Sequence, residues 1–598
     1  MPNISGRKGA FANPDPKNDG KFKLHVVKRL AGYLLRHKGS VLLACVLMIS
    51  SNLFALVGPQ LSGRAIDAVE GGAGQVDFRS AVFYCALMLL FYVASGVLGY
   101  ALSVVMINLS RKIVYAMRKE AFDHLMTLPV GYFDRTPFGD IVSHLSYDID
   151  TINASLSNDL LQICGSVITI AGSLIMMLRI CPVLVLVFAV TVPISTAFTT
   201  YKSKRVHPLF RTRSAKLGEL NGFSEEMLSG HRTIKAYNRE DVIIERFSSR
   251  NDEAVEAYYQ ADYHACIVGP SVNFINNLSL SLISMLGSIL YLLGRVHLSA
   301  ISTFILYSRK FSGPINEMAN IISELQSACA AAERVFALID EPSEIPDRPD
   351  ACVLRDVSGA LAMRHVHFGY MPEKQILHDL CFEAAPGKTV AIVGPTGAGK
   401  TTIINLLMRF YDPQQGEILL DGHELRQIVR SSLRLSYSMV LQDTWLFYGT
   451  IFENIAYGKE GATEQEVVEA AKAAHVHSFI ESLPDGYQTV LSDDGVNISK
   501  GQKQLLTIAR AMLCPAPMLI LDEATSNVDS RTEQEIQHAM RHLMRDKTCF
   551  VIAHRLSTIQ NADVILVMRG GSIIEQGTHD QLLQSGGFYA SLYNSQFS

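Results

Sequence analysis

Gly394-Pro395-Thr396-Gly397-Ala398-Gly399-Lys400-Thr401 matches the pattern G-x-x-x-x-G-K-[ST]. The apolar residues 389–393 before it predict a buried strand, and the residues from Thr402 onward predict a helix. The glycines of such a loop let backbone amides close around phosphate oxygens, and the helix N-terminus adds a favourable dipole. The stretch therefore predicts a nucleotide phosphate site, in which Lys400 reaches the terminal phosphates and Thr401 ligates Mg²⁺.

Long uncharged runs occupy the first half of the 598-residue chain. They are residues 39–63, 80–110, 160–178, 180–201 and 263–294. Since roughly 20 apolar residues cross the hydrocarbon core, each run predicts a transmembrane helix rather than part of a soluble helical core. A sixth span, from Val296 onward, is interrupted by Arg309 and Lys310. These two charges either line a cargo path or mark the cytoplasmic end of a displaced span.

Lysine and arginine are concentrated before the first run and in residues 202–262, whereas the connection 64–79 has only Arg64 and Arg79. The positive-inside rule therefore places both termini in the cytoplasm. We expect a multi-pass protein of the cytoplasmic membrane with an even number of spans. An even number places the phosphate loop on the side where ATP is, and this supports the sixth span. Residues 21–38 are basic and amphipathic, and we expect them to lie on the membrane surface.

The ten cysteines contain no C-x-x-C pair and form no His/Cys cluster along the sequence. Small buried hydrophobic roles are favoured for them over metal or disulfide roles. The net charge of −4 says little about partners, and no nucleic-acid partner is expected.

The acidic, proline-rich residues 340–349 separate this helical region from one in which short β-rich runs alternate with helical patterns. The sequence thus predicts a six-span α-helical transmembrane domain followed by an α/β P-loop nucleotide-binding domain. The expected boundaries are an N-terminal segment 1–38, a transmembrane domain 39–335, a linker 336–355 and a nucleotide-binding domain 356–598. The loops 111–159 and 202–262 are predicted to be helical extensions of the spans. Bends are expected at 135–140 and 229–230, where the membrane domain would touch the nucleotide domain.

Two acids follow the apolar strand predicted over residues 518–521. Asp522 suits a role in holding Mg²⁺, and Glu523 suits a general base that polarises the attacking water. Further upstream, Ser499 and Gly501 open a predicted helix and form a second potential anion site. One nucleotide cannot obviously use both sites of one chain, which suggests two such domains facing each other with ATP between them.

With these motifs in order, residues 22–598 resemble a half-size ATP-binding cassette exporter. The resemblance implies that Tyr370 stacks on adenine and that Gln442 senses Mg²⁺ and the γ-phosphate. It also implies that His554 is the switch histidine and that residues 526–529 cross the dimer interface. The implied catalytic residues are Glu523, His554 and Gln442, and the implied Mg²⁺ ligands are Thr401, Gln442 and Asp522. The implied nucleotide-binding set is Tyr370, Gly394, Pro395, Thr396, Gly397, Ala398, Gly399, Lys400, Thr401, Thr402, Ser499, Lys500, Gly501 and Gln502.

Residues 136–150 and 225–230 resemble the two coupling segments of exporters, the second of which typically docks on the partner's nucleotide domain. Two motifs depart from the family pattern. Residues 493–495 stand where Gly-Glu-Arg-Gly is usual, and Lys500 replaces a glycine of the signature Leu-Ser-Gly-Gly-Gln. We expect the side chain of Lys500 to restrict the backbone there and to add a charge near the nucleotide.

The resemblance implies an ATPase that exports hydrophobic or amphipathic small molecules by alternating access, as in multidrug exporters. Its expected cofactors are ATP and Mg²⁺, and its expected surroundings are the lipid bilayer and a second half-transporter. Lys500 favours a heterodimer over a homodimer, because the altered signature would then impair only one site. A lipid flippase, a peptide exporter and an ATP-gated channel or regulator are the alternatives, and the sequence does not name the cargo.

Overall fold

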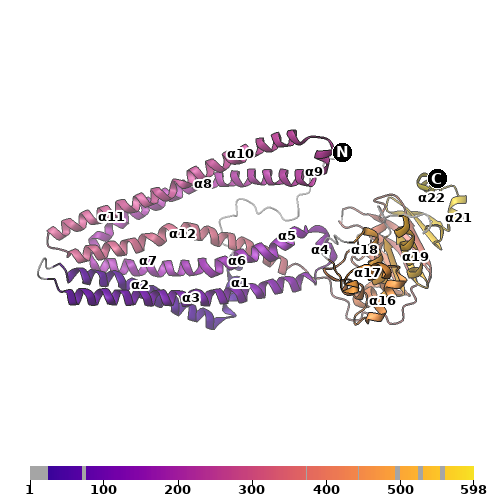
Figure 1. The fold of residues 1–598 in the computed structure, drawn as a ribbon, viewed down its shortest axis with the longest axis horizontal. Coiled ribbons are helices and arrows are strands. Elements are labelled where there is room, and N and C mark those ends of the chain that lie inside the picture. Colours follow the sequence, from indigo (N-terminus) through magenta and orange to yellow (C-terminus); the bar gives the residue numbers. More distant parts are fainter. Residues whose placement is uncertain are drawn as a thin grey trace. The chain divides into compact units, whose positions relative to one another are not determined.

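The computed structural model describes residues 24–70, 76–371, 373–441, 444–491, 498–522, 530–552 and 559–597 (Figure 1). The chain forms two compact units. The first unit comprises Met1–Met126 and Thr136–Glu341, and the second comprises Thr127–Arg135 and Pro342–Ser598.

The first unit is entirely helical in its described part. Its long helices are α1 (Leu24–Leu35), α2 (Lys38–Asp67), α3 (Phe78–Leu125), α7 (Leu160–Ile180), α8 (Pro182–Ser229), α10 (Glu240–Cys266), α11 (Val268–Leu292) and α12 (Leu298–Ile339). Its short elements are α5 (Phe138–Ser143), the π-helical turn η1 (His144–Asp148), α6 (Ile149–Ala154), the π-helical turn η2 (Ser155–Asp159) and α9 (His231–Ala236). In the described residues, five helical stretches are long and apolar enough to be candidate membrane spans. They are Lys38–Asp67, Phe78–Leu125, Phe138–Ile180, Pro182–Ser229 and Glu240–Leu292.

Helix α12, the predicted sixth span, is not among these five candidates, because its two internal charges keep its hydropathy low. Its aromatic residues Phe304 and Tyr307 are fully buried, in one apolar cluster with residues of α2, α7, α8 and α11. The hydroxyl of Tyr307 donates a 2.6 Å hydrogen bond to the carbonyl oxygen of Leu56 in α2. Because these contacts are made with the apolar spans, α12 belongs to the same bundle.

The predicted helical extensions are present, since α3, α8 and the continuous stretch of α10 and α11 run far beyond a membrane-spanning length. Helices α8 and α10 lie along each other (Figure 1). Arg213 of α8 pairs with Asp262 of α10 at 2.9 Å, and Lys216 pairs with Glu253 at 2.8 Å. Helix α8 ends at Ser229, where the second bend was expected.

The basic amphipathic segment forms α1, but its apolar side is covered by protein. Val26 and Tyr33 are 1% and 5% exposed. Tyr33 stacks on Phe336 of α12 with ring centroids 6.1 Å apart, and Arg29 lies over the same Phe336 ring. Helix α1 thus packs on α12, and its place on the membrane surface stays a prediction.

The second unit is an α/β fold. Its strands are β1 (Leu361–Phe368), β2 (Leu377–Ala384), β3 (Thr389–Val393), β4 (Gln415–Leu420), β5 (His423–Glu424), β6 (Tyr437–Val440), β7 (Gly449–Thr450), β8 (Val490–Leu491), β9 (Met518–Asp522), β10 (Thr548–Ile552), β11 (Val564–Arg569) and β12 (Ser572–Gly577). Its helices include α4 (Val130–Arg135), α13 (Lys400–Leu407), α14 (Arg430–Leu435), α15 (Ile451–Ala456), α16 (Glu464–Ala473), α17 (His477–Ser482), α18 (Lys500–Leu513), α19 (Ser530–Met544), α21 (His579–Gln584) and α22 (Phe588–Phe597).

The centre of the second unit is a six-stranded sheet of order β12-β11-β3-β10-β9-β6. All its pairings are parallel except that of β11 with β12. Alternate residues face opposite sides: Ala391 and Val393 pack with α15, α16, α18 and α19, whereas Val390 and Ile392 pack with α13 and a second sheet. This second sheet has four antiparallel strands in the order β2-β1-β4-β5.

The start of the second unit is tied to its core by ion pairs. The carboxylate of Asp347 pairs with the guanidinium group of Arg430 at 3.0 Å, and the carboxylate of Glu344 pairs with that of Arg434 at 2.7 Å. The predicted linker 336–355 therefore comprises the end of α12, which reaches Ile339, and a segment fixed on the second unit.

The segment Thr127–Arg135 also belongs to the second unit, although it directly follows α3 in the chain. The amide of Glu344 donates a 2.8 Å hydrogen bond to the carbonyl oxygen of Thr127. The sequence predicts a bend at residues 135–140 and a coupling segment at residues 136–150, and both stay predictions. The portion that packs within the second unit ends at Arg135, where the predicted bend begins.

Candidate nucleotide site

The loop 394–399 joins β3 to α13, as the sequence predicts. Gly394, Gly397 and Gly399 have φ values of 155°, 81° and 99°, in the region that favours glycine. A Cβ on Gly394 would lie 2.4 Å from the carbonyl oxygen of Met568, and one on Gly399 would lie 2.6 Å from a methyl group of Leu377. A Cβ on Gly397 would meet nothing within 4 Å, so this glycine serves the turn rather than close packing.

Lys400 is the first residue of α13 and is 9% exposed. Its ammonium group donates hydrogen bonds of 2.7 Å to the carbonyl oxygen of Gly394 and 3.1 Å to that of Pro395. Burial lowers the pKa of Lys400, and the nearby carboxylate of Asp522 opposes this shift. The lysine is thus folded over the loop and lies in the field of the predicted metal-binding acid.

The predicted catalytic residues follow the C-terminal ends of neighbouring parallel strands. The register aligns Ile392 of β3 with Ile552 of β10, and Ile552 with Asp522 of β9. Strand β10 leads into His554, strand β9 into Glu523 and strand β6 into Gln442. These three residues lie outside the described part of the chain. The carboxyl ends of parallel strands are the edge at which α/β sheets bind ligands.

The donor atoms available at this edge suit Mg²⁺. Thr401 is exposed in the first turn of α13, and Asp522 is partly exposed at the end of β9. A hydroxyl and a carboxylate are oxygen ligands, which Mg²⁺ prefers, together with waters and substrate phosphates. Thr402, the next residue of the predicted set, is buried.

Tyr370 is brought to the phosphate-loop helix from the other sheet. Its hydroxyl accepts a 2.8 Å hydrogen bond from the side-chain amide of Asn405 and lies 3.4 Å from the hydroxyl of Thr402. The ring remains 41% exposed. A partly exposed aromatic ring beside the phosphate loop fits the predicted stacking on adenine. Asn405 was not predicted from the sequence, because no motif marks a residue that only holds the tyrosine.

The signature residues open α18 in a capping box. Ser499 is the N-cap and accepts a 3.2 Å hydrogen bond from the amide of Gln502, while the Gln502 side chain accepts one of 2.9 Å from the amide of Ser499. Gly501 is buried.

Lys500 is exposed and is the first residue of α18. Its φ is not positive. A side chain is therefore accepted at Lys500 without backbone strain, and the effect of Lys500 on the signature site stays a prediction. What distinguishes Lys500 is its bulk and charge.

Comparison with known proteins agrees with this geometry. Residues 41–315 match the family described as "ABC transporter transmembrane region", and residues 377–526 match that described as "ABC transporter". The chain is 41% identical over 571 residues to "Uncharacterized ABC transporter ATP-binding protein YfiC" of Bacillus subtilis, covering 96% of this chain and 94% of that protein. The chain belongs to the ABC transporter family. It is an ATPase coupled to transport and a multi-pass membrane protein.

Other relatives of this ABC transporter have named cargoes. It is 44% identical over 530 residues to "Fatty acid ABC transporter ATP-binding/permease protein" of Mycobacterium bovis, covering 88% of this chain and 83% of that protein. It is 35% identical over 573 residues to "ATP-dependent lipid A-core flippase" of Idiomarina loihiensis, covering 96% of this chain and 98% of that protein. A solved structure of a bacterial Atm1-family ABC exporter with ATP bound has a TM-score of 0.78 and 29% identity, covering 94% of this chain and 99% of that chain. The ABC transporter described here thus has the exporter fold.

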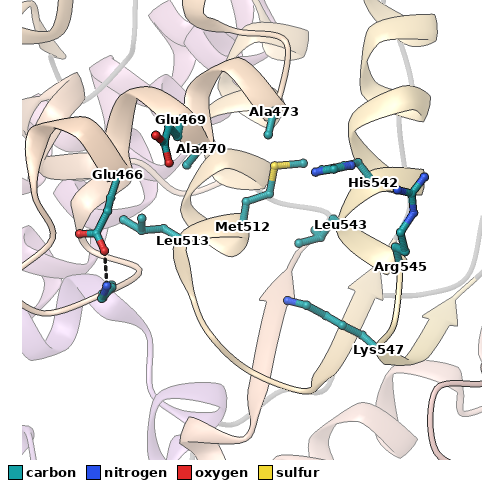
Figure 2. Close-up of a pocket in the computed structure, with 11 residues that line it drawn as sticks. Glu466, Glu469, Ala470, Ala473, Met512, Leu513, His542, Leu543, Arg545 and Lys547 are labelled. Carbon is teal, nitrogen blue, oxygen red and sulfur yellow. Dashed lines mark hydrogen bonds and ion pairs between the residues drawn. The ribbon is translucent and has the colours of Figure 1, made fainter.

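A separate pocket of about 370 Å³ lies between α16, the end of α18 and the end of α19 (Figure 2). Met512 lies in its middle, with Glu466 and Glu469 on the α16 side and the basic residues His542 and Arg545 on the α19 side. None of the predicted nucleotide-site residues that the structure describes lines it.

Proposed function

We propose that this chain is one half of a dimeric exporter that moves hydrophobic or amphipathic small molecules across the cytoplasmic membrane by alternating access. The observation that carries the proposal is the meeting of the phosphate loop, Lys400 and Asp522 at one edge of the parallel sheet. This edge belongs to a chain whose other unit is a bundle of membrane-spanning helices. Nucleotide chemistry in one unit would drive helix movement in the other.

The described residues account for binding and orientation. Backbone amides of the loop 394–399 and Lys400 would hold the phosphates, and Tyr370 would stack on adenine. Mg²⁺, when bound by Thr401, Asp522 and Gln442, would neutralise charge developing on the phosphates. Glu523 would accept the proton of the attacking water, and His554 would contact the γ-phosphate. For Gln442, Glu523 and His554 the support is their sequence position after the strand ends.

A dimer would place the signature of one chain against the phosphate loop of the other. Lys500 supports a heterodimer, because a partner with an intact signature would complete the site that contains Glu523. An exposed aromatic surface supports docking of a coupling segment. Trp445, Tyr448 and Tyr457 are 70%, 75% and 68% exposed, and large exposed aromatic groups of this kind suit protein contacts. We assign this surface to the partner's 225–230 segment.

The named relatives favour a cargo with acyl chains. A fatty acid and lipid A-core are amphiphiles with long apolar tails, and both names are those of proteins aligned over most of this chain. Amphiphiles of this class fall within the hydrophobic or amphipathic range. A lipid flippase is accordingly the second candidate function. Both termini would be cytoplasmic, as the distribution of lysine and arginine indicates.

The experiment is ATP-dependent transport in proteoliposomes that contain the purified full-length protein, alone and with a candidate partner half-transporter. The cargoes would be a labelled fatty acid, a fluorescent phospholipid and a cationic dye. We expect accumulation of the fatty acid or the dye to need ATP and to stop with vanadate. Movement of the phospholipid between leaflets, without accumulation in the lumen, would instead support the flippase.

The matched control is Glu523→Gln, which should bind ATP but not sustain transport. ATP-dependent flux that only dissipates a gradient, and that persists in Glu523→Gln, would contradict the exporter and favour an ATP-gated channel. A protonophore should leave transport intact, because the energy comes from ATP.

A further inference from the structure

A polar cluster lies on the solvent face of the antiparallel sheet, away from the residues assigned to nucleotide chemistry. His365 and His367 of β1 and Asp379 and Cys381 of β2 form this cluster. Their neighbours Val366, Phe368, Leu380 and Phe382 are all buried in the core beneath the sheet. The alternation of the two strands therefore turns the four polar side chains outward together.

The potential ligand atoms of three residues of this cluster are close enough to share one ion. Among the described residues, His365, Asp379 and Cys381 are the group whose His, Cys and carboxylate ligand atoms all lie within 4.8 Å of one another. His365 Nδ1 lies 2.7 Å from Asp379 Oδ1 and 3.6 Å from Cys381 Sγ. His367 Nε2 lies 4.0 Å from Asp379 Oδ1, outside this group, and a change of its side-chain rotamer would bring it in as a fourth donor. Ligand atoms around a tetrahedral Zn²⁺ lie roughly 3.3–3.8 Å apart, as bonds of about 2.0–2.3 Å require.

The backbone is irregular where these side chains meet. The pairing of β1 with β2 shifts register between Met363 and Val366 and again between Val366 and Phe368. His365 and Asp379 both have φ of 49°, a conformation uncommon for residues other than glycine. β-Bulges of this kind re-aim side chains, and strained residues of this kind concentrate at functional sites.

A simple ion pair does not account for the cluster. The side chains of His365 and Asp379 are 78% and 61% exposed, and an ion pair this open to water adds little stability. Cys381 Sγ accepts a 3.2 Å hydrogen bond from the amide of His365, but the ion pair gives no role to the second imidazole, that of His367. These donors differ from the all-oxygen set that Mg²⁺ prefers, and thiolate with imidazole is the set that Zn²⁺ prefers.

We propose that His365, His367, Asp379 and Cys381 form a binding site for a thiolate-preferring divalent transition metal, with Zn²⁺ as its probe. One thiolate and one carboxylate would balance the charge of the ion, and two neutral imidazoles would complete four ligands. Because the site is exposed to solvent, the metal can exchange with solution. The site is independent of the proposed transport cargo and of Mg²⁺ at the nucleotide site.

The test is metal binding by the full-length protein, with any affinity tag removed and without nucleotide. Zn²⁺ would be titrated against a chromophoric chelator, and Co²⁺ would be bound separately as a spectroscopic probe. We expect one more equivalent of Zn²⁺ per chain in the wild type than in Cys381→Ser. We also expect a thiolate-to-Co²⁺ charge-transfer band that Cys381→Ser abolishes. Affinity should fall by about 100-fold or more in Cys381→Ser and in His365→Gln, since even second-shell losses cost about 10–100-fold.

Matched controls separate this site from other thiols and imidazoles. Cys514→Ser and the exposed His423→Gln should keep the extra equivalent and the charge-transfer band. Asp379→Asn, a nearly isosteric change, should weaken binding while leaving ATP binding intact, which verifies the fold. Equal zinc stoichiometry and affinity in the wild type and in Cys381→Ser would overturn the proposal, as would a Co²⁺ spectrum without a thiolate band.

Discussion

The hydroxyl of Tyr411 donates a hydrogen bond to the carboxylate of Asp134. The Tyr411 ring also lies edge-on against Tyr370, with centroids 5.0 Å apart. A Cβ added to Gly131 would approach this ring to 3.0 Å, so the segment Thr127–Arg135 packs closely on it. One aromatic side chain therefore contacts both the predicted adenine-stacking residue and the segment that continues from α3.

Tyr411→Phe should reduce coupling without reducing nucleotide affinity. The ring contacts remain, but the hydrogen bond to a charged group, worth about 1.5–3 kcal/mol, is lost. Burial and this hydrogen bond raise the pKa of Tyr411, so the hydroxyl stays protonated as a donor. We expect an unchanged dissociation constant for ATP and a smaller ratio of cargo-stimulated to basal ATPase activity.

Tyr437→Phe is the matched control for this change. The Tyr437 hydroxyl is buried and makes no hydrogen bond within the described part of the chain. Its removal should leave coupling at the wild-type level. If both variants lost the same share of cargo stimulation, the contact between Tyr411 and Asp134 would not be the cause.

Tyr370→Ala should weaken ATP binding through loss of stacking. Base–aromatic stacking is worth about 1–3 kcal/mol, which corresponds to a roughly 5- to 150-fold higher dissociation constant. Tyr370→Phe keeps the ring and loses only the hydroxyl contacts with Asn405 and Thr402, so it should bind ATP nearly as well as the wild type. Binding of a fluorescent ATP analogue measures both. An affinity that is normal in Tyr370→Ala would remove this residue from the adenine site.

Glu523→Gln and Lys400→Ala should fail in different ways. The glutamine keeps the shape of the side chain but cannot accept a proton, so turnover should fall by about 10²–10⁴-fold with ATP binding intact. The alanine removes the ammonium group that lies over the phosphate loop, so the dissociation constant for ATP should rise. ATPase rates and equilibrium ATP binding, measured on the same preparations, distinguish the two. Wild-type turnover in Glu523→Gln would refute its assignment as the base.

The chain purified alone should have low ATPase activity, because both sites of a homodimer would contain Lys500. Co-expression with a second half-transporter that has an intact signature should restore cargo-stimulated activity. Lys500→Gly should raise the activity of the chain alone, since the backbone at Lys500 is helical and accepts either residue. Stable homodimers of the unaltered chain with high cargo-stimulated activity would exclude the heterodimer.

Neutralising Arg309 and Lys310 together tests whether they line the cargo path. Arg309 is exposed and Lys310 half-buried, next to the buried Tyr307 and Phe311 of α12. We expect the double glutamine variant to change which compounds stimulate ATPase activity and to leave the basal rate alone. The same stimulation profile as the wild type would identify both residues as anchors at the membrane surface.

Motif and hydropathy were enough to predict most of this architecture. The phosphate loop, its flanking strand and helix, and the acidic end of β9 are local patterns, so they could be read residue by residue. Local hydropathy alone did not predict the sixth span, because Arg309 and Lys310 lower the hydropathy of α12. Its burial of Phe304 and Tyr307 against other spans is visible only in three dimensions.

Contacts between residues distant in sequence escaped prediction. The amphipathic pattern of α1 does not say which residues it packs on, and its contact with Phe336 is visible only in three dimensions. Spacing also gave no sign of the cluster around His365 and Cys381. The two residues are 16 positions apart, and they meet only because a bulged antiparallel pairing joins their strands.

The assignment of Thr127–Arg135 to the second unit has a consequence for dissecting the protein. The second compact unit is discontinuous in sequence, because one short piece of it stands between α3 and α5 of the first unit. A fragment that begins at Pro342 would omit this piece and leave the Tyr411 hydroxyl without its acceptor. Cleavage near residue 341 would leave the second unit without Thr127–Arg135 and the first unit with this segment attached. The two units therefore cannot be separated, or exchanged between transporters, by a single cut.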